Sequence, residues 1–241
     1  MKQRNNYATD YDSKVWETGD LDHREIINPV VFSLLWSVKG KKILDLACGQ
    51  GYFSRILAKK WAKMTGIDNS KDLISIAREK SQRLPITYFP SDAAKLKDIK
   101  SGTFDCVVSN MAFMDIKDIT NTIKECSRVL KKDWFLVFSM VNPLFAEFER
   151  KKSKNTYFLK LFKYGTPFDR TNEKLGFKYK VTHYHRPINF YINTLAQNWF
   201  SISNYEEIAT KNFRWKKITD KKFLQFIQEF PSFVIIKAEK K

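Results

Sequence analysis

Short apolar runs alternate with amphipathic stretches between Lys42 and about Pro143. This alternation predicts consecutive strand–helix units that feed a parallel sheet. The apolar runs are expected as five strands, at 41–48, 63–69, 86–93, 104–111 and 134–142. The amphipathic stretches between them are expected as helices, at 51–61, 72–84 and 118–130.

The two flanks of this region differ from it in pattern. Residues 1–39 hold a polar aromatic segment and then an apolar-periodic stretch at 25–38, expected as a helix on the sheet edge. Residues 144–187 are aromatic and lysine-rich without a strand–helix rhythm, and form a candidate substrate lid. A helix at 188–199 and strands at 201–209 and 232–240 then close the sheet.

Together these patterns predict a single α/β domain over residues 1–241. Its fold is expected to be doubly wound and Rossmann-like, with a mostly parallel seven-stranded sheet and helices on both faces. An N-terminal helical cap (1–39) precedes the ligand-binding core (40–143). A lid insertion after the fifth strand (144–187) and a closing helix with two strands (188–241) follow it.

Charge and composition restrict the partners. The chain has 43 basic and 26 acidic residues, which gives a net charge of +17. A charge of this size suggests nucleic acid, anionic lipid or an acidic metabolite as a partner. Lysine far outnumbers arginine and is scattered, so solvated surface charge is favoured and nucleic acid is possible but not favoured. No apolar run reaches membrane-span length and the start lacks a signal peptide, so we expect a cytoplasmic protein. Three cysteines without a CxxC pair are expected in the core, with no metal site.

The central motif is DLACGQG, from Asp45 to Gly51. An acid at the end of an apolar strand is followed by a glycine turn that opens a helix, which lets the backbone approach a ligand closely. About twenty residues later Asp68 ends the second strand, where a carboxylate can accept both hydroxyls of a ribose. The spacing predicts an adenosine site.

Three details favour S-adenosylmethionine (SAM) over a dinucleotide. Counted from Gly49, the third glycine position of a dinucleotide fingerprint is Ser54, so the pyrophosphate cradle is incomplete. Ser91, Asp92 and Ala93 follow the third strand, where a carboxylate can accept from the adenine amine. The run SNMAFMD, 109–115, stands at the carboxyl end of the fourth strand, where open α/β sheets bind ligands.

With these residues the chain resembles the class I SAM-dependent methyltransferase family over about residues 7–143, and more weakly beyond. The resemblance implies SAM as the cofactor, S-adenosylhomocysteine as its product, and residues 40–143 as the SAM-binding core. It implies that Asp45, Ala47, Gly49 and Gly51 hold the methionine part, with Ala47 where the fullest family motif has glycine. The ribose, adenine and sulfur ends would be held by Asp68, Asn69, Ser70, Asp92, Ala93, Asn110 and Met111.

The resemblance is nearest to the branch of the family that acts on small molecules. SNMAFMD replaces the NPPY or DPPY run that N6-adenine methyltransferases use, and no PC dipeptide supplies a cytosine-5 nucleophile. The leading hypothesis is therefore transfer of a methyl group to a small-molecule acceptor by in-line displacement. Two alternatives stay open: an RNA or protein methyltransferase with a basic lid, and a SAM-binding module without catalysis. The sequence does not identify the acceptor or the oligomeric state.

Candidate catalytic groups come from the cap and the lid. Tyr11 and Trp16 could face the sulfonium by cation–π attraction, or simply cover the core. His23 and His185 are the favoured candidates for a base that removes a proton from the acceptor, with a packing role as the alternative. His183 is two residues from His185, but two histidines alone make a poor metal site. Asp115 could act on a substrate or cap a helix.

The lid separates the two enzyme hypotheses. A positive groove leading to Asn110 would favour RNA, and an enclosed aromatic pocket would favour a small acceptor. The lysines expected in such a groove are Lys151, Lys152, Lys154, Lys160 and Lys163. The aromatic residues expected in such a pocket are Tyr157, Phe158, Phe162 and Tyr191.

Overall fold

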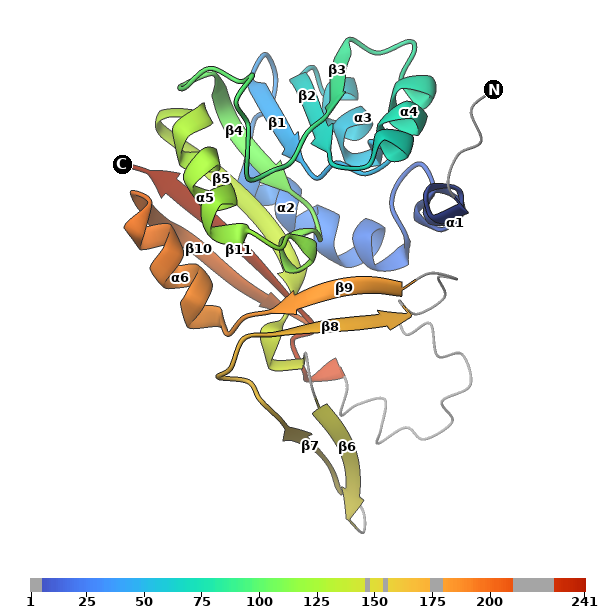
Figure 1. The fold of residues 1–241 in the computed structure, drawn as a ribbon, viewed down its shortest axis with the longest axis vertical. Helices are drawn as coiled ribbons and strands as arrows, with labels where there is room; N and C mark the ends of the chain where they lie inside the picture. The colour runs from blue at the N-terminus through green and yellow to red at the C-terminus, as the bar shows by residue number, and fades with distance from the viewer. Residues whose placement is uncertain (1–5, 146–147, 154–155, 174–179, 210–227) are drawn as a thin grey trace.

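The structure, a computed structural model, describes residues 6–145, 148–153, 156–173, 180–209 and 228–241. Its centre is a seven-stranded sheet in the order β10-β11-β5-β4-β1-β2-β3 (Figure 1). Six of the strands run in one direction and β11 alone runs in the opposite direction, which confirms the mostly parallel, Rossmann-like fold. The strands are β1 (Lys42–Leu46), β2 (Lys63–Asp68), β3 (Ile86–Pro90), β4 (Phe104–Ser109), β5 (Leu130–Val141), β10 (Phe200–Ile208) and β11 (Phe233–Lys240).

Helices cover both faces of this sheet. Buried side chains of α2 (Asn28–Leu35) and α3 (Tyr52–Lys59) pack on one face, and those of α5 (Ile119–Val129) and α6 (Ile188–Gln197) on the other. Helix α4 (Lys71–Lys80) packs against β2 and β3. Cys48, Cys106 and Cys126 are buried and free, as expected of core residues. Among the helices of the described ranges, none combines the length and apolarity that crossing a bilayer requires.

The N-terminal cap differs from its prediction. The polar aromatic segment forms α1 (Asn6–Val15), and the stretch expected as one helix divides into a π-helix, η1 (His23–Ile27), and α2. Val31 and Leu35 of α2 pack with Ile43 and Val137 on a face of the sheet, so the placement on the sheet edge was wrong. A face buries more apolar surface than an edge, and α2 is apolar enough to need it.

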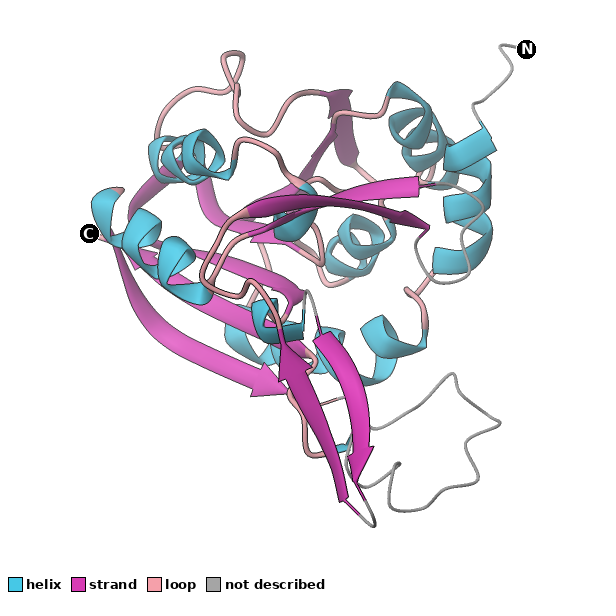
Figure 2. Ribbon diagram, turned by 60° about the horizontal axis from the view of Figure 1, so that its bottom comes forward, coloured by secondary structure: helices cyan, strands magenta, loops and turns pink. Residues whose placement is uncertain are grey.

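The insertion between β5 and α6 consists of two hairpins. They are β6 (Phe148–Ser153) with β7 (Thr156–Leu161), and β8 (Phe168–Glu173) with β9 (Lys180–His185). Figures 1 and 2 show β6–β7 projecting from the body, whereas β8–β9 lies across it. The sequence pattern did not predict these strands, because an isolated two-stranded hairpin leaves much of its surface outside the core and keeps little apolar alternation.

Candidate functional site

The turn after β1 is shaped for close approach of a ligand. Ala47, Gly49 and Gly51 have φ angles of 57°, 56° and 78°, all in the left-handed region. The Cys48 N–H donates to the Ile67 carbonyl at 2.8 Å, which joins the turn to β2. Because α3 begins at Tyr52, the unpaired N–H groups of its first turn lie directly after the glycines. Alanine at position 47 therefore carries a conformational cost that glycine would not.

Gly51→Ala should destabilise the protein by about 2 to 4 kcal/mol, from backbone strain and overpacking together. A Cβ at Gly51 would lie 2.5 Å from Tyr88 Oη and 3.0 Å from Ala77 Cβ. Gly40→Ala is the matched control, since Gly40 has φ +75° and nothing within 4 Å. It should cost about 1 kcal/mol. Urea unfolding measures both losses, and equal losses would show that the contact with Tyr88 carries no penalty.

Asp45 lies inside the protein behind this turn. Its Oδ2 accepts a hydrogen bond from Ser54 Oγ at 2.5 Å. Burial raises the pKa of Asp45 to about 7, against the lowering effect of the Ser54 hydrogen bonds. The carboxyl group that the family resemblance assigns to the methionine part of SAM is thus engaged with α3, and its contact with a ligand stays a prediction.

Asp45→Asn should remove a pH dependence of stability. The pKa is raised on folding, so the stability contributed by Asp45 is full below its unfolded pKa near 3.9 and is lost as pH rises through about 7. Between about pH 5.5 and 7 the variant should gain about 2 kcal/mol relative to wild type, because Asn accepts from Ser54 without ionising. Thermal unfolding across this pH range measures the difference, and a constant difference would contradict a protonated Asp45.

Asp68 ties the glycine turn to the start of α4. Its Oδ2 accepts from the Gly49 N–H and its Oδ1 from the Ser70 N–H, both at 2.9 Å. Ser70 also caps α4, because its Oγ accepts from Leu73 N at 3.2 Å. Burial raises the pKa of Asp68, and the two N–H donors oppose this rise. Asn69 is exposed beside it.

The cap lies over this turn. A Cβ at Gly49 would lie 3.3 Å from Tyr11 Cε1, so the Tyr11 ring covers the glycine. Burial, then Asp115 and Asp68, raise the pKa of Tyr7 to about 12, which places both carboxylates around the same tyrosine. In contrast, the Trp16 side chain is 55% exposed, which does not favour the predicted cation–π role.

Gln50, which the sequence did not single out, holds the cap in place. Its side chain is fully buried, and its Nε2 donates to the Trp16 carbonyl at 2.6 Å. Arg55 donates to both the main-chain and side-chain oxygens of Gln50. A lone glutamine between glycines gives no signal of this role in the sequence.

The third and fourth strands bring the remaining predicted cofactor residues to the same end of the sheet. Ser91 N donates to Asp68 O at 2.9 Å, Asp92 is half-exposed, and Ala93 is buried in the core. The Asn110 amide donates to Asn28 Oδ1 at 2.8 Å and to Tyr52 Oη at 2.9 Å.

Ser139 completes this network from β5. Its Oγ donates to Asn110 Oδ1 at 2.6 Å, and the same Oγ lies 2.8 Å from the Met111 N–H. Met111 follows with φ 57°, a left-handed conformation. The network joins β4 to the cap, α3 and β5. Its members Asn28, Tyr52 and Ser139 form no motif in the sequence, so the sequence analysis did not predict them.

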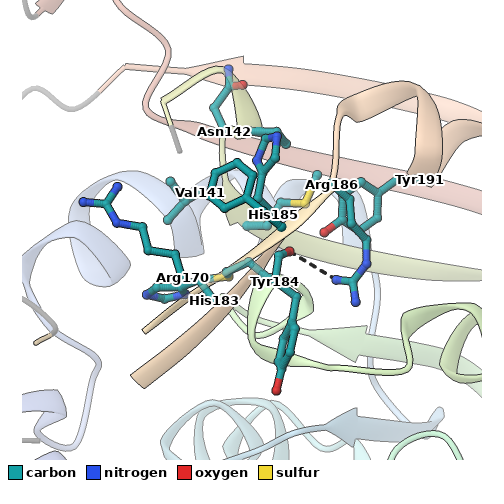
Figure 3. A pocket seen from close by; sticks show the side chains of 12 residues that line it. Val141, Asn142, Arg170, His183, Tyr184, His185, Arg186 and Tyr191 are labelled. Carbon is teal, nitrogen blue, oxygen red and sulfur yellow. Dashed lines mark hydrogen bonds between the residues drawn. The ribbon is translucent and has the colours of Figure 1, made fainter. Parts of the chain in front are cut away.

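A cavity of about 180 Å³ lies between the ends of β5, the short helix η2 (Phe113–Asp115) and the β8–β9 hairpin (Figure 3). Its wall is mostly apolar, with basic groups contributed by the hairpin. The lining residues are Met114, Met140, Val141, Asn142, Pro143, Phe168, Arg170, His183, Tyr184, His185, Arg186 and Tyr191. A ring stack of Phe113 on Phe138, with centroids 4.1 Å apart, lies in the core beside it.

The hairpin is fastened to η2 by charged groups. Arg186 donates to the carbonyls of Ile116 and Lys117 at 3.1 and 2.6 Å. His183 Nδ1 lies 2.5 Å from Asp115 Oδ1 as an ion-pair contact. The cavity lies at the same end of the sheet as the glycine turn, because its lining residues Met114 and Met140 lie at the carboxyl ends of β4 and β5, which run parallel to β1.

The two candidate bases lie in different places. His185 lines the cavity and is buried, and its Nε2 lies 2.8 Å from the Tyr164 carbonyl. A carbonyl can only accept, so Nε2 carries the hydrogen and neutral His185 presents Nδ1 as an acceptor. That nitrogen is buried and has no hydrogen-bond partner among the described residues. His23 instead pairs with Asp20 at 2.8 Å and is absent from the cavity lining.

Part of the lid prediction concerns residues that the structure does not describe in full. The side chains of Lys151, Lys152, Tyr157 and Phe158 lie outside the description, and so does the whole of residue Lys154. Tyr191 lines the cavity as expected, whereas Lys160 lies over the Phe162 ring at 5.1 Å and neither residue is in the lining. Lys163 is exposed. Within the described ranges, no three His, Cys, Asp or Glu side chains gather closely enough to hold a metal ion.

Comparison with known proteins agrees with this geometry. Residues 44–138 match the family model of a methyltransferase domain. Ubiquinone biosynthesis O-methyltransferase of Coxiella burnetii is 34% identical over 133 residues, 53% of this chain and 56% of that protein. A SAM-dependent methyltransferase structure from Mesorhizobium loti has a TM-score of 0.73 at 24% identity, covering 88% of this chain and 96% of that one. The chain therefore resembles class I SAM-dependent methyltransferases, by sequence over residues 44–138 and by fold over most of its length.

A third relative extends the comparison of folds. The structure of magnesium protoporphyrin IX methyltransferase from Synechocystis, solved with bound SAM, has a TM-score of 0.57 at 17% identity. It covers 100% of this chain, and this chain covers 86% of it. By sequence, the chain spans about half the length of the curated relatives it matches. The matched part, 44–138, includes the glycine turn, Asp68 and Asn110, and ends before the hairpins that form the cavity.

Proposed function

We propose that this methyltransferase transfers a methyl group from SAM to a hydroxyl group of a small, largely apolar acceptor bound in the cavity. The observation that carries the proposal is the position of the cavity, which lies at the carboxyl end of the parallel strands, the end that also holds the glycine turn and Asp68. The oxygen acceptor is supported by the Coxiella relative, which is named as an O-methyltransferase.

The residues around the glycine turn fit SAM. The alternate positions 47, 49 and 51 are left-handed and carry alanine or glycine, which keeps the turn free of side-chain bulk, and Tyr11 covers Gly49 from the cap. Asp68 offers carboxylate oxygens at the end of β2 for the ribose hydroxyls, with Asp92 and Ala93 on the adenine side. When bound, SAM supplies a methyl group already activated as an electrophile on a sulfonium, so the protein has to position the acceptor and exclude water.

On the acceptor side, the proposed base is His185. Its Nδ1 can accept the proton of the acceptor hydroxyl as the oxygen gains the methyl group. Met114, Met140 and Tyr191 surround the acceptor with apolar surface, which keeps the reacting groups dry. Arg186 and the Asp115–His183 pair hold the hairpin against the core, so the hairpin acts as the lid of the acceptor site.

Calorimetric titration with S-adenosylhomocysteine, with NAD as the comparison ligand, tests the cofactor. We expect micromolar binding of S-adenosylhomocysteine alone, whereas NAD binding or no binding would overturn the proposal. A screen of hydroxyl-bearing aromatic compounds with methyl-labelled SAM then tests the acceptor. Methylation of RNA or protein in place of every small compound would favour the basic-lid alternative, and binding without turnover would favour a non-catalytic module. The cytoplasmic location expected from the sequence stays part of this proposal.

A further inference from the structure

Three tryptophans of the described residues are mostly exposed. Trp36, Trp61 and Trp199 are 91%, 75% and 73% exposed. Each follows the carboxyl end of a helix, α2, α3 or α6, with φ between 55° and 68°. A left-handed backbone is rare for bulky residues, and an indole loses its hydrophobic stabilisation when it faces water. Trp16 follows α1 with the same backbone, φ 53°, but is 55% exposed; the greater exposure of the other three indicates that these indoles have a partner.

All three lie at one end of the sheet. The Gly40 N–H donates to the Trp61 carbonyl at 2.8 Å beside the start of β1, and the Lys241 N–H donates to the Trp199 carbonyl at 2.9 Å beside the end of β11. In Figure 1 this end is the one from which the arrows of β1, β2 and β4 depart, opposite α1 and the β8–β9 hairpin. The strand order separates β2 from β10 by five strand spacings, roughly 24 Å, so the indoles span a broad face.

Lysines are frequent in the segments around the indoles. We call this end, formed by residues 36–42, 59–63, 131–134, 199 and 237–241, the tryptophan–lysine face. Its acids are Asp133 and Glu239, while the neighbouring Asp105 already accepts from Lys131 Nζ at 2.6 Å. No arginine occurs in these segments. Its eleven lysines are Lys39, Lys41, Lys42, Lys59, Lys60, Lys63, Lys131, Lys132, Lys237, Lys240 and Lys241.

An apolar hollow lies within the same face. Its volume is about 310 Å³, and Trp36, Trp134 and Phe135 line it. Lys41 Nζ lies 4.2 Å from the Trp134 ring centre, and Lys237 Nζ lies 4.2 Å from that of Phe135. The lysines thus rim an aromatic surface, an arrangement with apolar side chains at the centre and cations around them.

We propose that the tryptophan–lysine face docks on the surface of an anionic phospholipid bilayer. Tryptophan partitions to the headgroup level of membranes, and each lysine near an anionic surface contributes about 1 kcal/mol. A bilayer is flat, which suits indoles spread across one end of the molecule. Nucleic acid fits less well, because its readers rely on arginine and on aromatic side chains that follow a groove. Docking leaves the cofactor turn and the cavity at the opposite end of the sheet, facing water.

Sedimentation with vesicles tests the proposal on the whole chain. At about 0.1 M salt the protein should bind phosphatidylcholine vesicles that contain about 30% phosphatidylglycerol, and should bind neutral vesicles or high-salt samples at least tenfold less. Tryptophan fluorescence should shift to shorter wavelength on binding. An absence of binding to anionic vesicles would overturn the proposal.

Two triple variants with the same charge change locate the contact. Lys39→Glu, Lys60→Glu and Lys132→Glu together should weaken vesicle binding at least tenfold. Lys71→Glu, Lys124→Glu and Lys163→Glu, exposed sites away from the face, should change it by less than threefold. Equal weakening would mean non-specific attraction and would overturn the proposal.

A third variant separates lipid from the other partners. Trp36→Ser, Trp61→Ser and Trp199→Ser together should also weaken vesicle binding at least tenfold. If these variants instead weaken binding of single-stranded RNA or abolish a dimer seen by light scattering, while vesicle binding stays unchanged, the face serves a different partner and the proposal is wrong.

Discussion

Asp68→Ala is expected to weaken the binding of S-adenosylhomocysteine about 100-fold or more. Hydrogen bonds to a charged group contribute about 1.5 to 3 kcal/mol each, and the ribose would lose two of them. The variant also releases the N–H groups of Gly49 and Ser70, so the glycine turn loses its link to α4. Because burial raises the pKa of Asp68, its ionised form costs the folded protein stability at neutral pH, which offsets part of the loss of these two hydrogen bonds. Calorimetry measures the affinity, and unfolding in urea measures the stability.

Asp92→Ala is the matched control for this change. Asp92 is half-exposed and pairs with Lys95 at 3.6 Å, so its contact with a ligand is screened by solvent. We expect a loss of affinity of less than about tenfold. Equal losses in the two variants would mean that the ribose is not held at the end of β2. Affinity within threefold of wild type in Asp68→Ala would remove the ribose assignment.

His185→Ala should lower the rate of methyl transfer about 10²- to 10⁴-fold, the usual contribution of a general base. Affinity for S-adenosylhomocysteine should change less than threefold, because His185 lines the acceptor cavity rather than the glycine turn. Single-turnover kinetics with the acceptor found in the screen measure the chemical step.

His23→Ala is the matched histidine control. His23 pairs with Asp20 in the cap and packs edge-on against Tyr52, with ring centres 5.6 Å apart. Its loss should leave the chemical step within about tenfold of wild type, well short of the loss of a base. A larger loss in His23→Ala than in His185→Ala would assign the base to the cap. Full activity in both variants would leave positioning as the main source of catalysis.

The local pattern of the chain determined its architecture. Apolar runs separated by amphipathic stretches predicted the strands and helices of the core, because each must bury one side to fold. The acid and glycines of DLACGQG and the acid at Asp68 predicted the cofactor turn, since few other residue types permit that backbone and that contact. The resemblance to class I methyltransferases rests on these residues, and the comparisons agree with it, in sequence over residues 44–138 and in fold over most of the chain.

Contacts between distant segments were decided only by the tertiary structure. The sequence placed His23 and His185 on equal terms, and only packing brought His185 to the cavity while it paired His23 with Asp20. The Asn110 network joins Asn28 and Ser139 from elements far apart in the chain. The spacing of these residues in the sequence therefore does not predict the network. The lysines are scattered along the sequence, yet the fold gathers eleven of them and three exposed indoles in segments at one end of the sheet. Short-range periodicity encodes which side of an element is buried, whereas the meeting of separate surfaces depends on how the elements pack.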